Sequence, residues 1–441
     1  MRLAVGFALL LALPAVSAEI RYVSADGDDD KDGLSEATSW RTLGKLGREL
    51  PAGGEARLRR GDVFYGCLRV RPGVDARRRT IVTAWGTGPA PVISGYLSPS
   101  RKAWRPVGKN LWSCAPADDG GLKGNAFEFN GNIGFLLADG VICGRKFFQA
   151  EKLAGQWDFF DDHRAVIVWS RENPAVVARE LFLAPNVYLV HGVDHLELRG
   201  LDIRGTGGHG FRGTVRDVRI VNCSFREIGG SHLTGEGGES VRYGNGIECW
   251  AGSSDVTVSN CVFSSVYDVA FTMQGPNPPR SWENVHVTDC VISNCTQAFE
   301  IWTKGCAAGI GFRKCSFERN LCVGIARGWG YEARPDKLNA VPLLTYALET
   351  DVCDLTVRDN RFENSRGPLI GCTRGLGSLP RGYQVTGNVV VGGSGTVCNV
   401  ISRTPADFER EKGIWTRNTF RSHEEDSSRR TPTGTDPPEC L

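Results

Sequence analysis

Apolar residues recur at fixed offsets along residues 194–420, and this pattern predicts most of the architecture. Within each unit, apolar or small residues lie at positions −7, −5, −2 and 0, counted back from the last of them. The central units are Val218, Ile220, Cys223, Phe225; Val256, Val258, Cys261, Phe263; Val285, Val287, Cys290, Ile292; and Ile310, Phe312, Cys315, Phe317. Related units reach back to residue 196 and forward to residue 420.

The spacing of these units indicates a solenoid of stacked strands. Successive position-0 residues lie between 22 residues apart (203 to 225) and 45 residues apart (317 to 362). A repeat of this length, with every second residue apolar inside it, is typical of short strands stacked turn upon turn. One turn cannot bury its apolar face alone, so neighbouring turns have to pack on each other.

Position −2 predicts what fills one inner corner of the solenoid. Along the chain it is occupied by Leu201, Cys223, Cys261, Cys290, Cys315, Asn360, Asn388 and Asn418. This column resembles the inward-facing asparagine ladder of right-handed parallel β-helices, with cysteine at four rungs. Buried cysteine packs as a small apolar side chain. Stacked turns lie about 4.8 Å apart, which exceeds the usual Cβ separation in a disulfide, so we expect mostly free thiols in the stack.

Composition narrows the class of protein. The 441 residues include 52 Lys and Arg against 50 Asp and Glu, so the net charge is only +2. This balance, with no zinc-finger or other nucleic-acid motif, argues against a nucleic-acid partner. The 55 glycines and two methionines suit a turn-rich β protein.

The two ends of the chain differ from the repeats. Residues 1–18 have a basic Arg2, an apolar stretch and a small-residue cleavage site, the pattern of a secretory signal. We therefore expect a secreted or periplasmic protein with no membrane segment after cleavage, and a monomer. Residues 421–441 are polar and contain proline, which predicts a disordered tail.

Residues 19–95 are expected to form a cap and the first turns. The stretch contains a YVS…DG start, a predicted cap helix at 37–46, a GD…F…G segment and an APVISG turn. It resembles the opening of secreted β-helix carbohydrate-active enzymes. The acidic turn at 26–33 is either a solvated turn or a calcium site, although its spacing lacks an EF-hand pattern. Residues 96–186 break the rhythm and predict an inserted β module, and residues 187–420 predict the main helix.

Alignment of the strands that follow each unit predicts an outward column of functional side chains. Gly246–Trp250 matches 298–302, which places Ile247, Phe271, Phe299 and Ile325 inside. Alternation then places Arg212, Glu248, Thr272, Glu300 and Ala326 outside, in one exposed column, with Trp250 and Trp302 two residues further on. Exposed tryptophan beside carboxylates is a composition suited to sugars, because the ring stacks on a pyranose face.

Three carboxylates are the candidate catalytic residues. Glu248 and Glu300 are two strands apart, about 9–10 Å between Cα atoms, and side chains can bring the carboxyl groups to about 6.5–9.5 Å, the inverting-glycosidase range. Asp268 precedes its strand and could face the same groove. In the alternative interpretation, Glu248 only pairs with Arg212. The candidate substrate-binding residues are Trp250, Trp302, Gln274, Lys304, Arg327, Arg242, Tyr243 and His232.

Two long insertions could wall this groove. Residues 229–245 precede the Glu248 strand, and residues 329–351 follow the Ile325 strand, so the sequence predicts loops on opposite sides of one face. Gly208-His209-Gly210 resembles a motif of β-helix polygalacturonases, but the other motifs of that family are absent nearby. We therefore interpret His209 as structural.

The segment 242–275, together with 298–302 and 326–334, resembles secreted bacterial β-helix proteins related to glycoside hydrolases and polysaccharide lyases. The resemblance implies an all-β, right-handed parallel β-helix of the pectin-lyase type that acts on a polysaccharide. The first hypothesis is a glycoside hydrolase without a cofactor. The alternatives are a lyase that cleaves uronate chains, which needs a cationic or phenolic base and a cation such as calcium, and a non-catalytic glycan-binding protein or adhesin.

Overall fold

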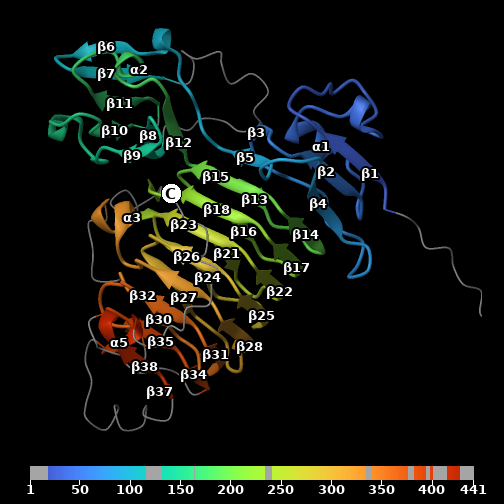
Figure 1. Cartoon of the computed structure of the whole chain (residues 1–441), viewed down its shortest axis with the longest axis vertical. Coiled ribbons are helices and arrows are strands. Elements are labelled where there is room, and N and C mark those ends of the chain that lie inside the picture. Colours follow the sequence, from blue (N-terminus) through green and yellow to red (C-terminus); the bar gives the residue numbers. More distant parts are fainter. Residues whose placement is uncertain are drawn as a thin grey trace, which may run out of the picture.

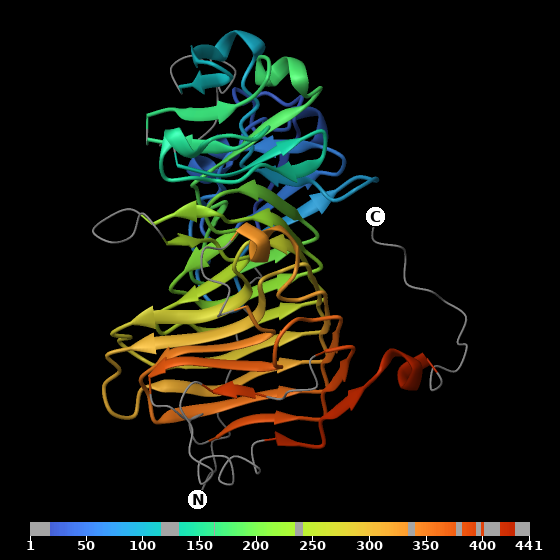
Figure 2. The ribbon, with the colours of Figure 1, turned by 90° about the vertical axis from the view of Figure 1, so that its left-hand side faces the viewer.

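Parallel strands wind through almost the whole chain and stack into an elongated solenoid (Figures 1 and 2). The structure, a computed structural model, describes residues 18–115, 132–162, 164–233, 241–333, 340–375, 382–393, 398–400 and 415–427. The predicted signal, apart from residue 18, and the tail beyond residue 427 lie outside the described residues. The predicted parallel β-helix is confirmed.

Three parallel sheets form the sides of the helix. Sheet A contains β1 (Ile20–Val23), β2 (Glu55–Arg59), β4 (Thr80–Trp85), β14 (Leu196–Arg199), β17 (Arg216–Val221), β22 (Ser254–Ser259), β25 (Trp282–Thr288), β28 (Gly311–Glu318), β31 (Val352–Arg358), β34 (Tyr383–Thr386) and β37 (Trp415–Thr416). Sheet B contains β3 (Val63–Tyr65), β5 (Val92–Ser94), β15 (Asp202–Thr206), β18 (Ser224–Ile228), β23 (Val262–Val266), β26 (Val291–Ser293), β29 (Leu321–Val323), β32 (Arg361–Glu363), β35 (Val389–Val391) and β38 (Thr419–Arg421). Sheet C contains β13 (Val190–His191), β16 (Phe211–Gly213), β21 (Ile247–Trp250), β24 (Val269–Pro276), β27 (Gln297–Lys304), β30 (Leu343–Leu348), β33 (Ile370–Gly375) and β36 (Cys398–Val400).

The core consists of the inward residues of all three sheets. Because side chains alternate along a strand, one apolar residue in two points inside and stacks on its counterpart in the next turn. Phe225 stacks on Phe263 with ring centroids 5.3 Å apart, and Phe271 stacks on Phe299 at 6.1 Å. Each turn therefore buries its apolar face only against its neighbours, as the repeat predicts.

The predicted inner column is continuous, but one rung is occupied by a different residue. The backbone N–H of each rung donates to the side chain of the next: Cys223 to the sulfur of Cys261, Cys261 to that of Cys290, and Cys290 to Oδ1 of Asn320 at 2.9 Å. The chain of bonds continues through Asn360, Asn388 and Asn418. Sulfur thus replaces the amide oxygen as acceptor at two rungs, Cys261 and Cys290.

The expectation that Cys315 is a rung was wrong. Cys315 lies in β28 and pairs with Leu355, so it belongs to sheet A. Asn320 is the rung, because its amide also donates to Asn360 at 3.0 Å. The unit was displaced by five residues, since Phe312 and Phe317 are both buried and either fits the apolar pattern. The rung thiols Cys223, Cys261 and Cys290 are free, as expected.

A short helix closes the first turn. The expected cap helix is α1 (Leu43–Glu49), and its Leu43 and Leu46 are buried. It begins later than predicted because Thr42 is its N-cap and accepts the Lys45 N–H at 3.0 Å. Asp29 of the acidic turn accepts the N–H groups of Arg41 and Thr42. This carboxylate therefore organises the start of the helix.

Residues 96–186 form antiparallel sheets outside the helix, drawn in cyan and green at the top of Figure 2. One sheet contains β6 (Arg105–Gly108), β7 (Leu111–Cys114), β10 (Phe159–Asp161) and β11 (Val166–Trp169), and the other contains β8 (Ile133–Ala138), β9 (Val141–Cys143) and β12 (Leu181–Pro185). The helix α2 (Pro174–Val177) lies beside them. A cluster that includes Trp104, Phe159 and Leu181 gives this module its own core.

The chain after the last strand begins with an ordered element. Residues predicted as tail include α5 (His423–Ser427), where the buried Asp426 pairs with Arg361 and with Arg421. This part of the tail therefore packs on the last turn. Among the described residues, no helix has the length and apolar character that crossing a bilayer requires.

Candidate functional site

The outward column predicted on sheet C exists in the expected register. Arg212 pairs with Glu248, Glu248 with Thr272, and Thr272 with Glu300 on adjacent strands β16, β21, β24 and β27. The next partner is Leu344 of β30, not Ala326 as expected. Ala326 instead lies in a turn with φ 61° and is fully buried.

A second outward column runs beside the first. Trp250 pairs with Gln274, and Gln274 with Trp302. The two indole rings are 6.4 Å apart and inclined by 50°. The Arg212 guanidinium lies 4.3 Å from the Trp250 ring centroid, a cation–π contact that joins the two columns.

The carboxylates of the first column are covered, which corrects the expectation of an exposed column. Glu248 is 1% exposed and Glu300 is 7% exposed, and Thr272 between them is fully buried. These side chains do point away from the core of the helix.

Glu248 is held by four polar side chains. Its carboxylate accepts from Arg212 Nε at 2.5 Å, from Asn245 Nδ2 at 2.8 Å and from Gln274 Nε2, and it lies 3.4 Å from His209 Nε2. The pair with Arg212, left open by the sequence, is therefore present. Because it is buried, loss of one partner would leave an uncompensated charge, which is far more costly than loss of a surface pair.

His209 is a central member of this cluster. Its Nδ1 accepts the backbone N–H of Asn245 at 3.1 Å, so in the neutral ring the proton lies on Nε2, which faces Glu248. The imidazole lies between the rings of Tyr188 and Tyr243, at 5.0 and 5.1 Å. Burial lowers the pKa of His209, and the charges of Glu248 and Asp268 only partly oppose this shift.

Asp268 belongs to the same cluster. It is half-buried at the start of β24, and its charge acts on His209. The backbone N–H of Asp268 donates to the Gly244 carbonyl at 3.2 Å, which fixes the turn before the strand. The charges of Glu248 and Asp268 therefore both act on one imidazole, and Glu300 lies two strands from Glu248 in the same column.

Three long insertions leave the helix at one corner, between a sheet B strand and the following sheet C strand. They are residues 96–186 between β5 and β13, residues 229–246 between β18 and β21, and residues 324–342 between β29 and β30. The second expected loop therefore precedes its sheet C strand, and the expectation of two loops on opposite sides was wrong. Figure 1 shows the module and α3 (Gly328–Ala333) near each other at this corner.

Arg242 ties the three insertions together. It lies in the small hairpin of β19 (Ser231–His232) and β20 (Arg242–Tyr243). Its guanidinium donates to the carbonyls of Gly230, Gly134 and Ala333 at 2.7–3.1 Å and stacks on Tyr267. Trp329 of α3 packs on Tyr267 and on Phe135 of the module. Arg242 is thus buried among backbone carbonyls, and it does not reach an open groove.

His232 is also buried at this junction. It lies 3.8 Å from Asp161, which forms an ion pair with Lys146 at 2.6 Å inside the module. Burial lowers the pKa of Lys146 to about 8, although Asp161 opposes the shift. Tyr243, in contrast, faces the cluster, because its ring contacts His209 and its hydroxyl donates to Asn186 at 2.6 Å.

The remaining predicted cations lie at the margin. Lys304, at the end of β27, is exposed. Arg327 is also exposed, and its Nε donates to the Asn364 carbonyl at 2.6 Å. Gln274 is half-buried and bound to Glu248, and Trp302 is half-buried. Neither of the two cations contacts Glu248 through a hydrogen bond recorded for the described residues.

Sequence reasoning missed Tyr188 and Asn245 and took His209 as purely structural. The Gly-His-Gly motif was a usable signal, because it directly precedes a sheet C strand. Tyr188 and Asn245 carried no signal, since their roles depend on how the corner folds. We call the set His209, Arg212, Tyr243, Asn245, Glu248, Asp268, Gln274 and Glu300, with Trp250 and Trp302, the sheet C cluster.

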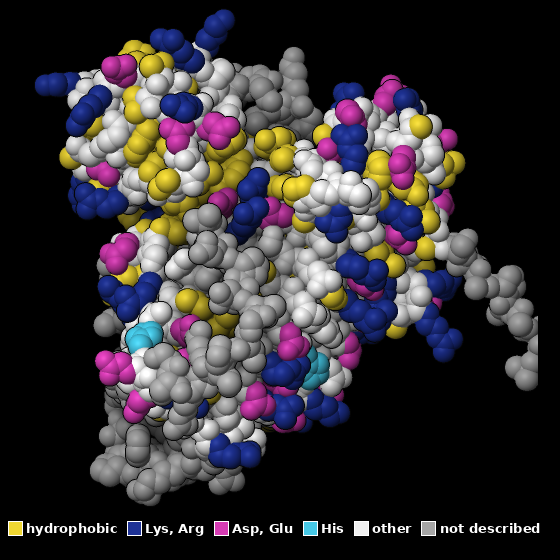
Figure 3. Space-filling view, in the orientation of Figure 1, with side chains coloured by type: hydrophobic (Ala, Val, Ile, Leu, Met, Phe, Trp, Pro, Cys, Tyr) yellow, Lys and Arg dark blue, Asp and Glu magenta, His cyan; other side chains and the backbone are white. Residues whose placement is uncertain are grey.

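The arrangement provides a hydrogen-bonded carboxylate, a histidine whose pKa is lowered by burial, and a second carboxylate on strands that also carry two indole rings. Such a set can position a hydroxyl-rich ligand and transfer protons to or from it. Charges are interspersed over the face drawn in Figure 3, where dark blue and magenta side chains lie among each other. The face does not resemble a polyanion-binding surface.

Comparison with known proteins identifies the handedness and type of the helix. A family model described as a right-handed β-helix region matches residues 187–337. No curated protein matches the chain in sequence. The fold is therefore a right-handed parallel β-helix.

Several solved structures resemble the chain at low sequence identity. The complex of XylC with xylose is 10% identical, with a TM-score of 0.53, over 91% of this chain and 82% of that one. A lacto-N-biosidase from Eubacterium ramulus is 13% identical, with a TM-score of 0.45, over 92% of this chain and 64% of that one. A pectate lyase is 12% identical, with a TM-score of 0.39, over 86% and 77%.

Proposed function

We propose that this right-handed β-helix protein is a secreted glycoside hydrolase that acts on a polysaccharide at the sheet C cluster. The observation that supports the proposal is the pair of adjacent columns on the outer side of sheet C. One column contains Glu248 and Glu300 two strands apart, and the other contains Trp250 and Trp302. Carboxylates beside indole rings suit acid–base cleavage of a sugar chain.

The spacing of the carboxylates favours hydrolysis with inversion. Two strand spacings correspond to about 9–10 Å between the Cα atoms of Glu248 and Glu300. Inverting glycosidases hold their carboxyl groups about 6.5–9.5 Å apart, which leaves room for the attacking water. Within this scheme Glu248 and Glu300 are the acid–base pair, and Asp268 is the third candidate.

The contacts of Glu248 give it a second possible role. Four polar side chains surround its carboxylate, which orients Arg212, Gln274 and His209. Arg212 in turn covers one face of Trp250. In this role Glu248 is a positioning residue, and Trp302 offers the more open ring for a sugar.

The positions of the predicted cationic side chains support a lyase less well than a hydrolase. β-Elimination needs a base and a positive group that neutralises the uronate carboxylate. Arg242 is committed to three backbone carbonyls, and Arg327 donates to the chain itself. Lys304 is the remaining exposed cation of the predicted set. A lyase and a non-catalytic glycan-binding protein are therefore alternative outcomes of the test.

The test is a screen of polysaccharides with two readouts. Neutral and uronate-containing polysaccharides are incubated with the protein, and reducing ends and ultraviolet absorbance are measured together. Xylan is included because the XylC structure contains xylose. The proposal predicts reducing ends without absorbance. Reducing ends with an absorbing unsaturated end would identify a lyase, and binding without products would identify a glycan-binding protein.

A further inference from the structure

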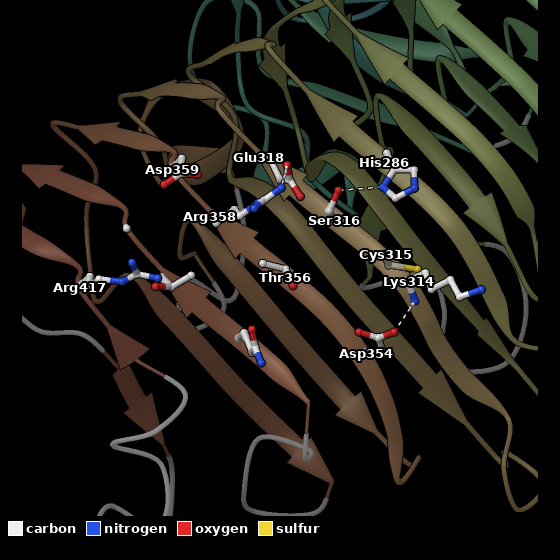
Figure 4. Close-up of a pocket in the computed structure, with 13 residues that line it drawn as sticks. His286, Lys314, Cys315, Ser316, Glu318, Asp354, Thr356, Arg358, Asp359 and Arg417 are labelled. Carbon is white, nitrogen blue, oxygen red and sulfur yellow. Dashed lines mark hydrogen bonds and ion pairs between the residues drawn. The ribbon is translucent and has the colours of Figure 1, made fainter.

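A polar hollow of about 740 Å³ lies on the outer face of sheet A, on a different side of the helix from the sheet C cluster (Figure 4). Strands β25, β28, β31 and β34 supply most of its lining, and the turn before β38 supplies Arg417. The lining residues are His286, Lys314, Cys315, Ser316, Glu318, Asp354, Thr356, Arg358, Asp359, Gln384, Thr386, Gly387 and Arg417. None of the candidate residues predicted from the sequence lies in it.

The hollow lies where a row of residues with left-handed backbone conformation ends. Near the start of four successive sheet A strands, one residue has a left-handed backbone, with φ between 51° and 58°: Asp217, Asp255, Asn284 and Lys314. The next strand, β31, lacks this residue, so the pairing of β28 with β31 shifts between Phe312 and Cys315. Asp354 of β31 accepts the Lys314 N–H at 3.0 Å.

The change of register between β28 and β31 alters the direction of the side chains at the hollow. A bulge places two residues opposite one and bends its strand, and bulges often occur beside functional sites. Lys314 and Asp354 consequently lie at one end of the hollow, as Figure 4 shows. The hollow is thus produced by the backbone and does not depend on the rotamer of one surface side chain.

Two outward columns form the floor. One contains His286, Ser316, Thr356 and Gln384, and the other contains Glu318, Arg358 and Thr386. Ser316 and His286 are hydrogen-bonded at 2.8 Å, and Glu318 pairs with Arg358 at 3.0 Å. The lining thus presents hydroxyl, amide and imidazole groups from neighbouring strands about 4.8 Å apart.

The charges of the lining cancel. Lys314, Arg358 and Arg417 are balanced by Glu318, Asp354 and Asp359, and the lining contains no Phe, Tyr, Trp, Val, Leu or Ile. A polyanion would meet three carboxylates, and an apolar ligand would find almost no apolar contact. A ligand that both donates and accepts many hydrogen bonds, and that carries no charge, matches this surface.

We propose that the sheet A hollow binds a neutral, hydroxyl-rich oligosaccharide, as a second glycan site separate from the sheet C cluster. The class of ligand rests on the proposed function, whereas the position of the site rests on the hollow itself. Thr356 and Gln384 are adjacent in one column and take the central hydrogen-bonding role. Such a site would hold a polysaccharide chain on the enzyme without taking part in cleavage.

Calorimetric titration with defined hexasaccharides tests the proposal. The probes are hexamers of xylose, glucose, mannose and galactose, and a galacturonate hexamer for comparison. All proteins carry Glu300→Gln and Trp302→Ala, which remove the proposed acid and the proposed stacking ring of the sheet C cluster. Into this background we place Thr356→Ala with Gln384→Ala. The matched control is Thr257→Ala, which lies one strand before His286 in the same column and outside the hollow.

The expected result is that a neutral hexamer binds the background protein, that the double variant weakens binding at least tenfold, and that Thr257→Ala leaves it unchanged. The inference is overturned if no neutral hexamer binds, if only the galacturonate hexamer binds, or if the double variant binds as well as the control. Binding at the hollow by a wild-type protein that yields no products would leave this inference standing and contradict the proposed hydrolase.

Discussion

His209 and Glu248 show how a residue that points away from the core can still be buried. Glu248 lies on the outer side of sheet C, yet it is 1% exposed and accepts hydrogen bonds from three side chains. His209 presents Nε2 to this carboxylate because the backbone of Asn245 occupies Nδ1. At the scale of single residues, the site is therefore an electrostatic arrangement that depends on burial.

The lowered pKa of His209 predicts a pH-dependent contribution to stability. The histidine of the unfolded chain titrates near 6.5, and the folded pKa is lower because of burial. As the pH falls below 6.5, the unfolded state binds the proton first, so the stability that His209 contributes above 6.5 is progressively lost.

His209→Asn removes this titration and keeps an acceptor near Nδ1. The difference in melting temperature between wild type and variant should therefore shrink from pH 7 to pH 5. A difference that stays constant over this range would show that His209 does not titrate below its usual range.

The ion pair between Lys146 and Asp161 predicts a large loss of stability when it is broken. Both side chains are buried, and Asp161 also accepts the Ile133 N–H at 3.1 Å. Asp161→Ala should lower the free energy of unfolding by about 3–5 kcal/mol, because Lys146 would remain buried without its counter-ion.

The control for this prediction is the exposed pair of Asp75 and Arg78. Asp75→Ala should change the free energy of unfolding by about 0–1 kcal/mol. Urea unfolding measures both values. Equal losses for the two variants would mean that the buried pair is not specially stabilising.

At the scale of elements, the inner column of rungs is the feature that unites the helix. Three thiols and four amides occupy equivalent places, and each rung after Cys223 accepts the backbone N–H of the preceding rung. The repeat pattern predicted the column, because its positions are defined by alternation and spacing. It could not locate the rung between Cys290 and Asn360, because Phe312 and Phe317 fit the apolar pattern equally well.

The shared geometry of the rungs predicts which substitutions they tolerate. Asn360→Ala leaves the buried N–H of Asn320 without its acceptor, so the free energy of unfolding should fall by about 1–3 kcal/mol or more. Asn360→Cys should cost less, because sulfur accepts this N–H at the rungs of Cys261 and Cys290. Urea unfolding of both variants tests the ranking, and a cysteine variant less stable than the alanine variant would contradict it.

At the scale of the whole molecule, the main departure from a regular helix is the set of three insertions at one corner. Their positions in sequence were visible as breaks in the repeat, and the module, the hairpin and α3 occupy them. The sequence did not predict that the three insertions meet at one corner, because this depends on whether each insertion precedes or follows its sheet C strand. The expected sheet C strand around Ile325 shows this. The strand that follows β27 in sheet C is β30, which comes after the second insertion, so the insertion precedes its strand and does not follow it.

Arg242 tests the role of the corner. Its three bonds to carbonyls join the module, the hairpin and α3, so Arg242→Met should lower the melting temperature by several degrees. Arg327→Met, at an exposed position, should leave it nearly unchanged. If Arg242→Met is as stable as Arg327→Met but raises KM alone, Arg242 binds substrate and does not hold the corner.

The central claim is that the sheet C cluster hydrolyses a polysaccharide, and the activity of Glu300→Gln tests it most directly. The amide keeps the shape of the side chain and removes its proton chemistry. On the polysaccharide that gives most reducing ends, with thermal unfolding to show that the variant is folded, kcat should fall at least about 10²-fold, the contribution of a positioned acid or base. A folded variant that keeps full activity would contradict the account.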